Sequence, residues 1–143
     1  HQTGVDGYEQ VVSAYRRKGL KAEVHAFIED MGSAYAGADL VICRAGATSI
    51  AEITALGLPS ILIPYPFASD DHQTLNAKCL AQAGAAVVIR QDKLTGATLA
   101  EAIRPLCQGP QSIAAMKEKV RRFGRPGAAA MIAENFLKMI KKA

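Results

Sequence analysis

The stretch DLVICRAGATSIAEI, residues 39–53, joins a short apolar run to a helical pattern through a loop of small residues. The run up to Cys43 is almost wholly apolar, as expected for a parallel strand that is covered on both faces. Gly46 and Ala47 lie in the loop, and the helical pattern follows at Thr48. In open α/β sheets, ligands bind where such a strand passes into its helix. The stretch therefore predicts a parallel sheet and the place of a binding site on it.

Short runs rich in β-branched residues alternate with longer helical patterns on both sides of this stretch, which is typical of βαβ units around a parallel sheet. The predicted strands are residues 22–27, 39–44, 60–64 and 85–90. The predicted helices are residues 6–18, 31–37, 48–56, 70–82, 98–107, 113–123 and 128–142. We therefore expect an α/β fold, with a Rossmann-like parallel sheet and helices on both of its faces.

Glycines and capping residues mark the ends of these helices. Gly19, Gly57 and Gly84 each follow a helical pattern and are expected in the left-handed conformation that ends many helices. Asp30 and Ser69 each precede a helical pattern, so we expect their side chains to accept hydrogen bonds from the first helical turn.

The length and composition fit a single domain over residues 1–143. A chain of 143 residues, 50% of them apolar, can build one hydrophobic core but not two. The chain starts at His1 rather than Met and lacks the opening strand and glycine-rich turn of a doubly wound sheet, so we expect a truncated start. Its three cysteines are far apart and lack C-x-x-C spacing, which argues against disulfides and a zinc site and favours a reducing, cytosolic setting.

The net charge of +4 does not indicate nucleic-acid binding. Basic residues are spread along the chain, which has only four Phe, four Tyr and no Trp to stack on bases. We expect no nucleic-acid partner and interpret the basic residues as a solvated helix face near an anionic membrane surface. No apolar run approaches the roughly 20 residues needed to cross a bilayer.

The small residues before Thr48 leave backbone amides open to a phosphate group, which the positive end of the helix dipole would attract. Thr48 and Ser49 add hydroxyl donors at the same end. Glu52 shares a helix face with both, so its carboxylate can accept hydrogen bonds from two adjacent ribose hydroxyls. The pattern Ser49-x-x-Glu52 is also typical of a capping box, in which Glu52 bonds the backbone amide of Ser49. Spacing alone leaves both interpretations open.

Other charged residues near this stretch allow more than one interpretation. Arg44 ends the predicted strand and would either balance phosphate charge or pair with a carboxylate. Asp70 and Asp71 stand beside His72, as in some metal sites, but acidic residues also favour the first turn of a helix, and we predict no metal site here. His25 lies in a predicted strand and is expected to be structural.

The run CRAGATSIAEITALGLPSILIPYPFASDDHQTLNAKCLAQAGAAVVI, residues 43–89, resembles the MurG family of UDP-N-acetylglucosamine transferases, which form lipid II in peptidoglycan synthesis. The resemblance extends to residues 1–4 and to FIEDMGSAYAGADLVI, residues 27–42, and weakens after about Lys93. It implies the C-terminal, donor-binding half of a GT-B fold that lacks its first strand or strands. It also implies chemistry without a cofactor or a metal.

The resemblance implies roles for individual residues at a donor site. The residue matching Glu52 binds the ribose hydroxyls of UDP, and the backbone of the residue matching Ile28 reads the uracil edge. The turn at residues 47–49 would meet the sugar and the phosphates. The pair matching His72 and Gln73 would contact the hydroxyls of N-acetylglucosamine, and the first position of this pair varies within the family. Together with the physical argument, this gives the expected donor-binding residues Ile28, Arg44, Ala47, Thr48, Ser49, Glu52, His72 and Gln73.

For the whole protein, the resemblance implies a hexosyltransferase that moves N-acetylglucosamine from its UDP donor to lipid I during cell-wall synthesis. Lipid I would bind an N-terminal domain that is absent from this chain. The enzyme would be a cytoplasmic, peripheral protein on the inner face of a bacterial cell membrane, with a role in cell shape and division. We expect no catalytic residue in this chain and no transfer by the chain alone.

Two other functions remain open for the sequence. In the first, the chain is a stand-alone UDP-sugar-binding subunit of a two-component glycosyltransferase. In the second, it is a non-catalytic nucleotide-binding α/β domain in which Glu52 only caps its helix. Loss of UDP binding on Glu52→Gln would argue against the second of these.

Overall fold

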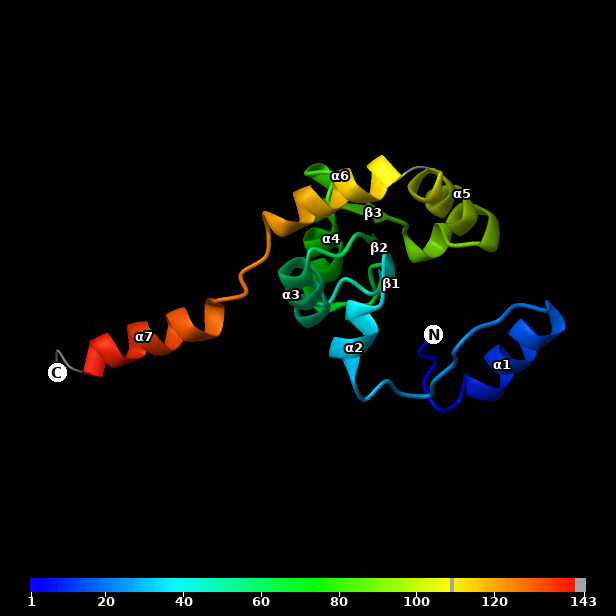
Figure 1. Cartoon of the computed structure of the whole chain (residues 1–143), viewed down its shortest axis with the longest axis horizontal. Helices are drawn as coiled ribbons and strands as arrows, with labels where there is room; N and C mark the ends of the chain where they lie inside the picture. The colour runs from blue at the N-terminus through cyan, green and yellow to red at the C-terminus, as the bar shows by residue number, and fades with distance from the viewer. Residues whose placement is uncertain (109, 141–143) are drawn as a thin grey trace. The chain divides into compact units, whose positions relative to one another are not determined.

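A computed structural model describes residues 1–108 and 110–140 of the chain, which divides into two compact units. The first unit is His1–Gly37, and the second begins at Ala38. Figure 1 shows the order of the helices and strands along the chain. The second unit holds the sheet and most of the expected site residues.

Three short parallel strands form the sheet of the second unit. They are β1 (Val41–Cys43), β2 (Ser60–Leu62) and β3 (Ala86–Val88), in the order β1-β2-β3. Ile61 in the central strand lies between Ile42 on one side and Val87 on the other. β2 is buried along its whole length, as expected for a strand with a neighbour on each side. Each strand lies inside a predicted one but is shorter, and the parallel pairing confirms the predicted sheet.

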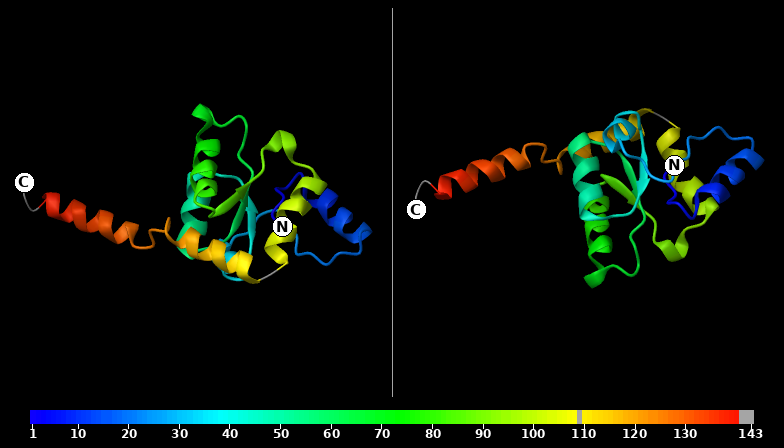
Figure 2. Two further views of the ribbon diagram at one scale, coloured as in Figure 1. Left: turned by 90° about the horizontal axis from the view of Figure 1, so that it is seen from above. Right: turned by 90° about the horizontal axis from the view of Figure 1, so that it is seen from below.

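Helices cover both faces of this sheet. α3 (Ala47–Leu56) connects β1 to β2, and α4 (His72–Gln82) connects β2 to β3. Connections between parallel strands are right-handed, and both of these run in the same direction across the sheet, so both helices lie on one side. α5 (Gly96–Cys107) follows β3 and lies on the other side in both views of Figure 2. The predicted two-sided helix cover is confirmed.

α6 (Pro110–Arg121) closes the C-terminal ends of α3 and α4. Gly57 and Gly84 end these two helices in the left-handed conformation, with φ of 67° and 66°, as predicted. The side chain of Arg121 lies against Gly57, and that of Lys119 lies against Gly84. A cation near the end of a helix is favourable, because the last carbonyl groups carry partial negative charge, and the guanidinium of Arg121 also pairs with Glu118 at 3.0 Å.

α7 (Ala128–Ile140) follows the break at Gly124, Pro126 and Gly127. The end of the predicted helix, residues 141–142, lies outside the described residues. Among the described residues, no helix is long and apolar enough to cross a membrane. Several large apolar side chains of α7 are exposed, namely Met131, Ile132, Phe136, Leu137, Met139 and Ile140.

The first unit contains α1 (Tyr8–Arg17), α2 (Met31–Ala36) and an isolated parallel bridge between Gln2 and His25. The strand predicted at residues 22–27 is therefore wrong. Residues 1–4 lie beside this segment, for example through the hydrogen bond from Thr3 N to His25 O at 2.9 Å, but among the described residues the pairing amounts to an isolated bridge rather than a strand ladder.

The two predicted capping residues have different outcomes. Asp30 caps α2, since its carboxylate accepts a hydrogen bond from the backbone amide of Ser33 at 2.9 Å. Ser69 is not the N-cap of α4. Instead, Ser69–Asp71 form a separate 3-10 turn, η1, and α4 begins after it at His72.

Gly124→Ala is expected to lower the free energy of unfolding by about 1–3 kcal/mol, because of overpacking against α3. A Cβ at this position would lie 2.5 Å from the backbone carbonyl oxygen of Thr54. Gly127→Ala is the matched control, since a Cβ there meets nothing within 4 Å. Both changes restrict the unfolded chain alike, so urea unfolding of the two variants isolates the clash. Equal stability of the two would contradict the close packing of residue 124 on α3.

Candidate functional site

The segments that follow the three strands meet at one edge of the sheet, because β1, β2 and β3 are parallel. The expected site residues of the second unit all lie in the first two turns of α3 or α4 or just before these helices. Those after β1 are Arg44, Ala47, Thr48, Ser49 and Glu52, and those after β2 are His72 and Gln73.

The N-terminus of α3 has no side-chain cap. Its first residue is Ala47, and the N-cap is Gly46, with φ of −66° and ψ of 149°. The backbone amides of Ala47, Thr48 and Ser49 therefore form the first turn, whose amides have no carbonyl partner within the helix. Ser49 is the third helical residue rather than the N-cap, so the capping-box alternative for Ser49 and Glu52 is wrong. A helix N-terminus of this kind attracts anions.

Gly46 is not required by the packing of the chain itself. Its φ of −66° suits any residue, and a Cβ at this position meets nothing within 4 Å. The preceding residue, Ala45, is fully buried, and its carbonyl oxygen accepts a hydrogen bond from Asn76 Nδ2 at 3.2 Å. The loop is thus held from beneath by α4, while its outer surface at Gly46 stays open. Glycine is frequent where a ligand approaches the backbone closely.

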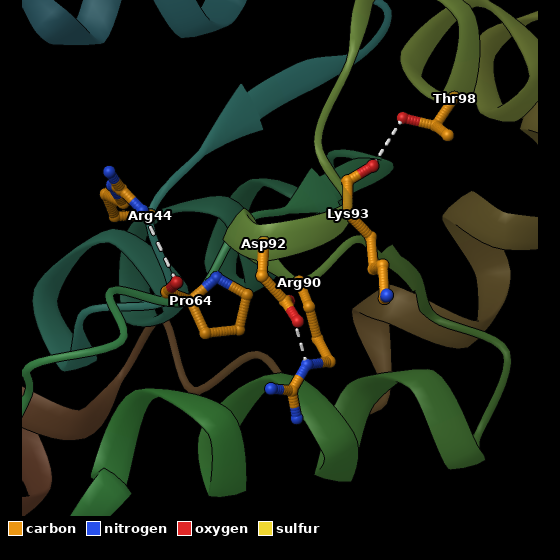
Figure 3. Close-up of polar contacts among 6 residues, drawn as sticks. All are labelled: Arg44, Pro64, Arg90, Asp92, Lys93 and Thr98. Carbon is orange, nitrogen blue, oxygen red and sulfur yellow. Dashed lines mark hydrogen bonds and ion pairs between the residues drawn. The ribbon is translucent and has the colours of Figure 1, made fainter.

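Arg44 joins the ends of β1 and β2. Its Nη1 donates hydrogen bonds to the carbonyl oxygens of Ile63 and Pro64, at 3.2 and 3.3 Å, and Figure 3 shows the contact with Pro64. Its guanidinium carbon also lies 5.4 Å from the centre of the Tyr65 ring, within range of a cation–π interaction. These contacts are with carbonyls and a ring rather than with a carboxylate, and the phosphate role of Arg44 stays a prediction.

The side chains of His72 and Gln73 hold the segment between β2 and α4 through hydrogen bonds with its backbone. The backbone amide of Tyr65 donates to Gln73 Oε1 at 3.0 Å. His72 Nδ1 lies 2.7 Å from the carbonyl oxygen of Ser69. His72 is exposed and Gln73 is half-buried, so both side chains remain accessible at the edge of the sheet.

Asp70 and Asp71 both adopt the left-handed conformation, with φ of 51°. This conformation is uncommon for residues other than glycine and costs free energy, so the surrounding contacts must impose it. The predicted role of the two residues in the first turn of α4 is therefore wrong. They form the strained turn that leads into the helix at His72.

A cavity of about 460 Å³ lies beside this turn, between the segments that follow β2 and β3. Arg90 and Asp92 form an ion pair in it, with 3.1 Å between Nε and Oδ1, and Figure 3 shows this pair beside the bond from Thr98 to the carbonyl of Lys93. The sequence interpretation missed these residues, although they directly follow the third strand of the sheet. The cavity is lined by Pro64, Pro66, Phe67, Asp71, Thr74, Arg90, Gln91 and Asp92.

Glu52 lies close to the end of β1. The pKa of the Cys43 thiol is raised to about 11, mainly because the thiol is buried and also because the negative charge of Glu52 opposes its ionisation. The Glu52 side chain itself is exposed. The structure therefore brings a carboxylate to the same edge as the open N-terminus of α3.

Ile28 belongs to the first unit, where its backbone amide donates a hydrogen bond to Gln2 Oε1 at 2.9 Å. The amide that was expected to read a base thus has a side-chain partner within its own unit. The remaining expected site residues all belong to the second unit and lie along the single edge described above.

Known proteins resemble this chain closely. The glycosyltransferase family 28 C-terminal domain matches residues 1–134. The UDP-N-acetylglucosamine–N-acetylmuramyl-(pentapeptide) pyrophosphoryl-undecaprenol N-acetylglucosamine transferase of Myxococcus xanthus is 51% identical over 134 residues, which are 94% of this chain and 35% of that protein. The transferase of the same name from an Anaeromyxobacter species is 46% identical over 142 residues, 99% of this chain and 37% of that protein.

Among solved structures, the crystal structure of Acinetobacter baumannii MurG superposes with a TM-score of 0.87 at 37% identity. The match covers 96% of this chain and 42% of that chain. The chain thus spans little more than a third of the length of the curated relatives that it matches.

Cys43 is expected to react with iodoacetamide mainly at high pH, because only the thiolate is nucleophilic and its pKa is about 11. At pH values below this pKa, each increase of one pH unit should raise the rate about tenfold. Glu52→Gln removes the opposing charge, so it should lower the pKa of Cys43 and shift the rate profile to lower pH. The exposed Cys107 is the internal control, and its profile should not move. Mass spectrometry of the labelled peptides gives both rates. An unchanged Cys43 profile in Glu52→Gln would mean that Glu52 does not lie near the end of β1.

Proposed function

The chain belongs to the glycosyltransferase family 28 C-terminal domain family, and we propose that it binds the UDP-N-acetylglucosamine donor of a cell-wall glycosyltransferase. Its relatives are named for the transfer of N-acetylglucosamine to an N-acetylmuramyl-(pentapeptide) pyrophosphoryl-undecaprenol. The proposal for the whole protein is the same transfer, which extends lipid I to lipid II in peptidoglycan synthesis.

The observation that carries the proposal is the uncapped N-terminus of α3 beside Gly46. A diphosphate placed there would accept hydrogen bonds from the first amides of the helix and from the Thr48 and Ser49 hydroxyls. Because Gly46 has no side chain, a diphosphate would have room to approach the backbone there. The packing of the chain does not itself require a glycine at this position, since a Cβ would meet nothing within 4 Å. The exposed position of Arg44 also allows it to approach the phosphates.

Other residues would bind the remaining parts of the donor. The Glu52 carboxylate would accept hydrogen bonds from the ribose hydroxyls, since it lies one turn along the helix from the phosphate-binding amides. The backbone of Ile28 would bind the uracil edge. In that complex a uracil carbonyl takes the place of Gln2 Oε1 as the acceptor for the Ile28 amide. His72 and Gln73 would bind hydroxyls of the sugar.

The chemistry that this site would contribute is stabilisation of the leaving group. Breaking the bond between the sugar and UDP places negative charge on the diphosphate, and helix amides that are already in place stabilise it without reorganising. In our proposal this chain supplies no base for the acceptor hydroxyl, so acceptor binding and catalysis involve the part of the protein outside this chain. We also propose that the whole enzyme works at the inner face of the cell membrane as a peripheral protein.

Glu52→Gln should weaken UDP binding about tenfold, because a neutral amide is a poorer acceptor for two ribose hydroxyls. Titration calorimetry with UDP-N-acetylglucosamine, UDP and GDP measures the effect, and UDP should bind more tightly than GDP. Equal binding of UDP and GDP, or a Glu52→Gln variant that changes stability but not affinity, would remove the support for a donor site.

Gly46→Ala should weaken binding at least about tenfold while changing the free energy of unfolding by less than about 1 kcal/mol. The new methyl group meets no atom of the chain but lies where the diphosphate would approach. Gly96→Ala is the control, since Gly96 also lies at a helix N-terminus, as the first residue of α5, and a Cβ there meets nothing within 4 Å. An unchanged affinity in Gly46→Ala would count against a phosphate at this loop.

A further inference from the structure

One hydrogen bond determines the tautomer of the neutral His72 imidazole. Its Nδ1 lies 2.7 Å from the carbonyl oxygen of Ser69, and a backbone carbonyl can only accept a hydrogen bond. Nδ1 must therefore carry the hydrogen. A neutral imidazole has only one N–H group, so the other ring nitrogen, Nε2, keeps a lone pair and is an acceptor.

The amide of Gln73 has the opposite arrangement. The backbone amide of Tyr65 donates to Gln73 Oε1 at 3.0 Å, which assigns the side-chain oxygen to the interior of the loop. A flipped amide would put its NH₂ group against the N–H of Tyr65, where no hydrogen bond can form. Gln73 Nε2 and its two hydrogens are therefore left for other partners.

We propose that His72 and Gln73 present opposite hydrogen-bonding polarity to the donor sugar: His72 Nε2 accepts the hydrogen of one hydroxyl, and Gln73 Nε2 donates to the oxygen of another. This inference rests on the proposed donor site and deepens it. In each residue, one polar atom bonds the backbone of the loop between β2 and α4, and this bond determines whether the remaining nitrogen accepts or donates.

This polarity gives a rule for selectivity. A hydroxyl can donate or accept, so it fits either residue. A fluorine can accept weakly but cannot donate, so it fails against His72 Nε2 and is partly tolerated by Gln73 Nε2. A sugar lacking either hydroxyl leaves a polar group of the site without a partner, which disfavours its binding.

The first test is nitrogen-15 NMR of the histidine side chains in the free chain, at about pH 8.5, where imidazoles are largely neutral. We expect His72 to carry its hydrogen on Nδ1. His25 serves as the comparison within the chain, and His72→Asn identifies the His72 signals. A hydrogen on Nε2 of His72 would overturn the proposal, whether or not the chain binds any nucleotide sugar.

The second test uses UDP-N-acetylglucosamine analogues in which one sugar hydroxyl at a time is replaced by fluorine or by hydrogen. At the position that faces His72, both replacements should weaken binding equally, by about tenfold. At the position that faces Gln73, fluorine should weaken binding less than hydrogen does. Fluorine that is tolerated better than hydrogen at the His72 position would overturn the assigned polarity.

Two conservative variants identify which position faces which residue. His72→Asn keeps an amide NH₂ near the place of Nδ1, to hold Ser69, but has no atom at Nε2. It should abolish the preference for a hydroxyl over fluorine or hydrogen at the His72 position only. Gln73→Glu keeps an acceptor for the Tyr65 amide but no longer donates, and it should abolish the preference for fluorine over hydrogen at the other position. Discrimination that survives in both variants would overturn the proposal.

These outcomes separate this inference from the proposed function. Absence of UDP-N-acetylglucosamine binding would refute the donor site, while the NMR result would still decide the orientation of the His72 hydrogen. Binding of the donor with the reverse fluorine pattern would keep the donor site and refute only the polarity.

Discussion

The parallel pairing of β2 with both β1 and β3 is the constraint on which the rest of the structure depends. It places the carboxyl ends of all three strands at one edge, and hence the start of α3 and of α4 beside each other. Contacts across that edge, from Arg44 to the end of β2 and from Asn76 to Ala45, then fix the loops between strand and helix. The backbone that forms the site is thus held by a sheet and two side chains, and the surface that faces outward is left open.

The helices of the second unit are stabilised differently at their two ends. α3 and α4 end at left-handed glycines covered by Arg121 and Lys119, whereas their N-termini have no side-chain cap. α5 has a complete capping box, in which Thr95 and Thr98 satisfy each other's backbone amides. An uncapped N-terminus gives up roughly 1 kcal/mol of helix stability. Both of these helices carry expected donor-binding residues, and the uncapped N-terminus of α3, which has no acidic residue in its first turn, is the one suited to an anion.

Regular features of the sequence predicted much of the fold. Alternating apolar runs and helical patterns predicted the parallel sheet, and Gly57 and Gly84 marked the ends of α3 and α4 because a left-handed residue there favours glycine. Two predictions of local structure, the strand at residues 22–27 and the cap at Ser69, were wrong because the local sequence alone does not decide either of them. The segment around His25 has the composition of a strand but, in the part of the chain that the structure describes, forms an isolated bridge with Gln2. Ser69 has the chemistry of a cap but lies in a turn ahead of the helix. The sequence did not indicate Arg90 and Asp92, because the pairing of β3 with β2 is what brings their segment beside the one that follows β2.

The sequence by itself determined the class of fold, because this follows from local patterns of apolar, small and capping residues. The family followed from its resemblance to known sequences, and the loop at which a donor would bind stays a prediction. Only the tertiary structure decided that α3 starts at Gly46 without a cap, which excluded the capping box at Ser49 and Glu52. It also decided that Arg44 holds the end of β2, and which atoms of His72 and Gln73 face inward. The physical reason is that a hydrogen bond depends on where its partner lies in space, and residues such as Arg44 and Pro64 meet only after the strands have paired.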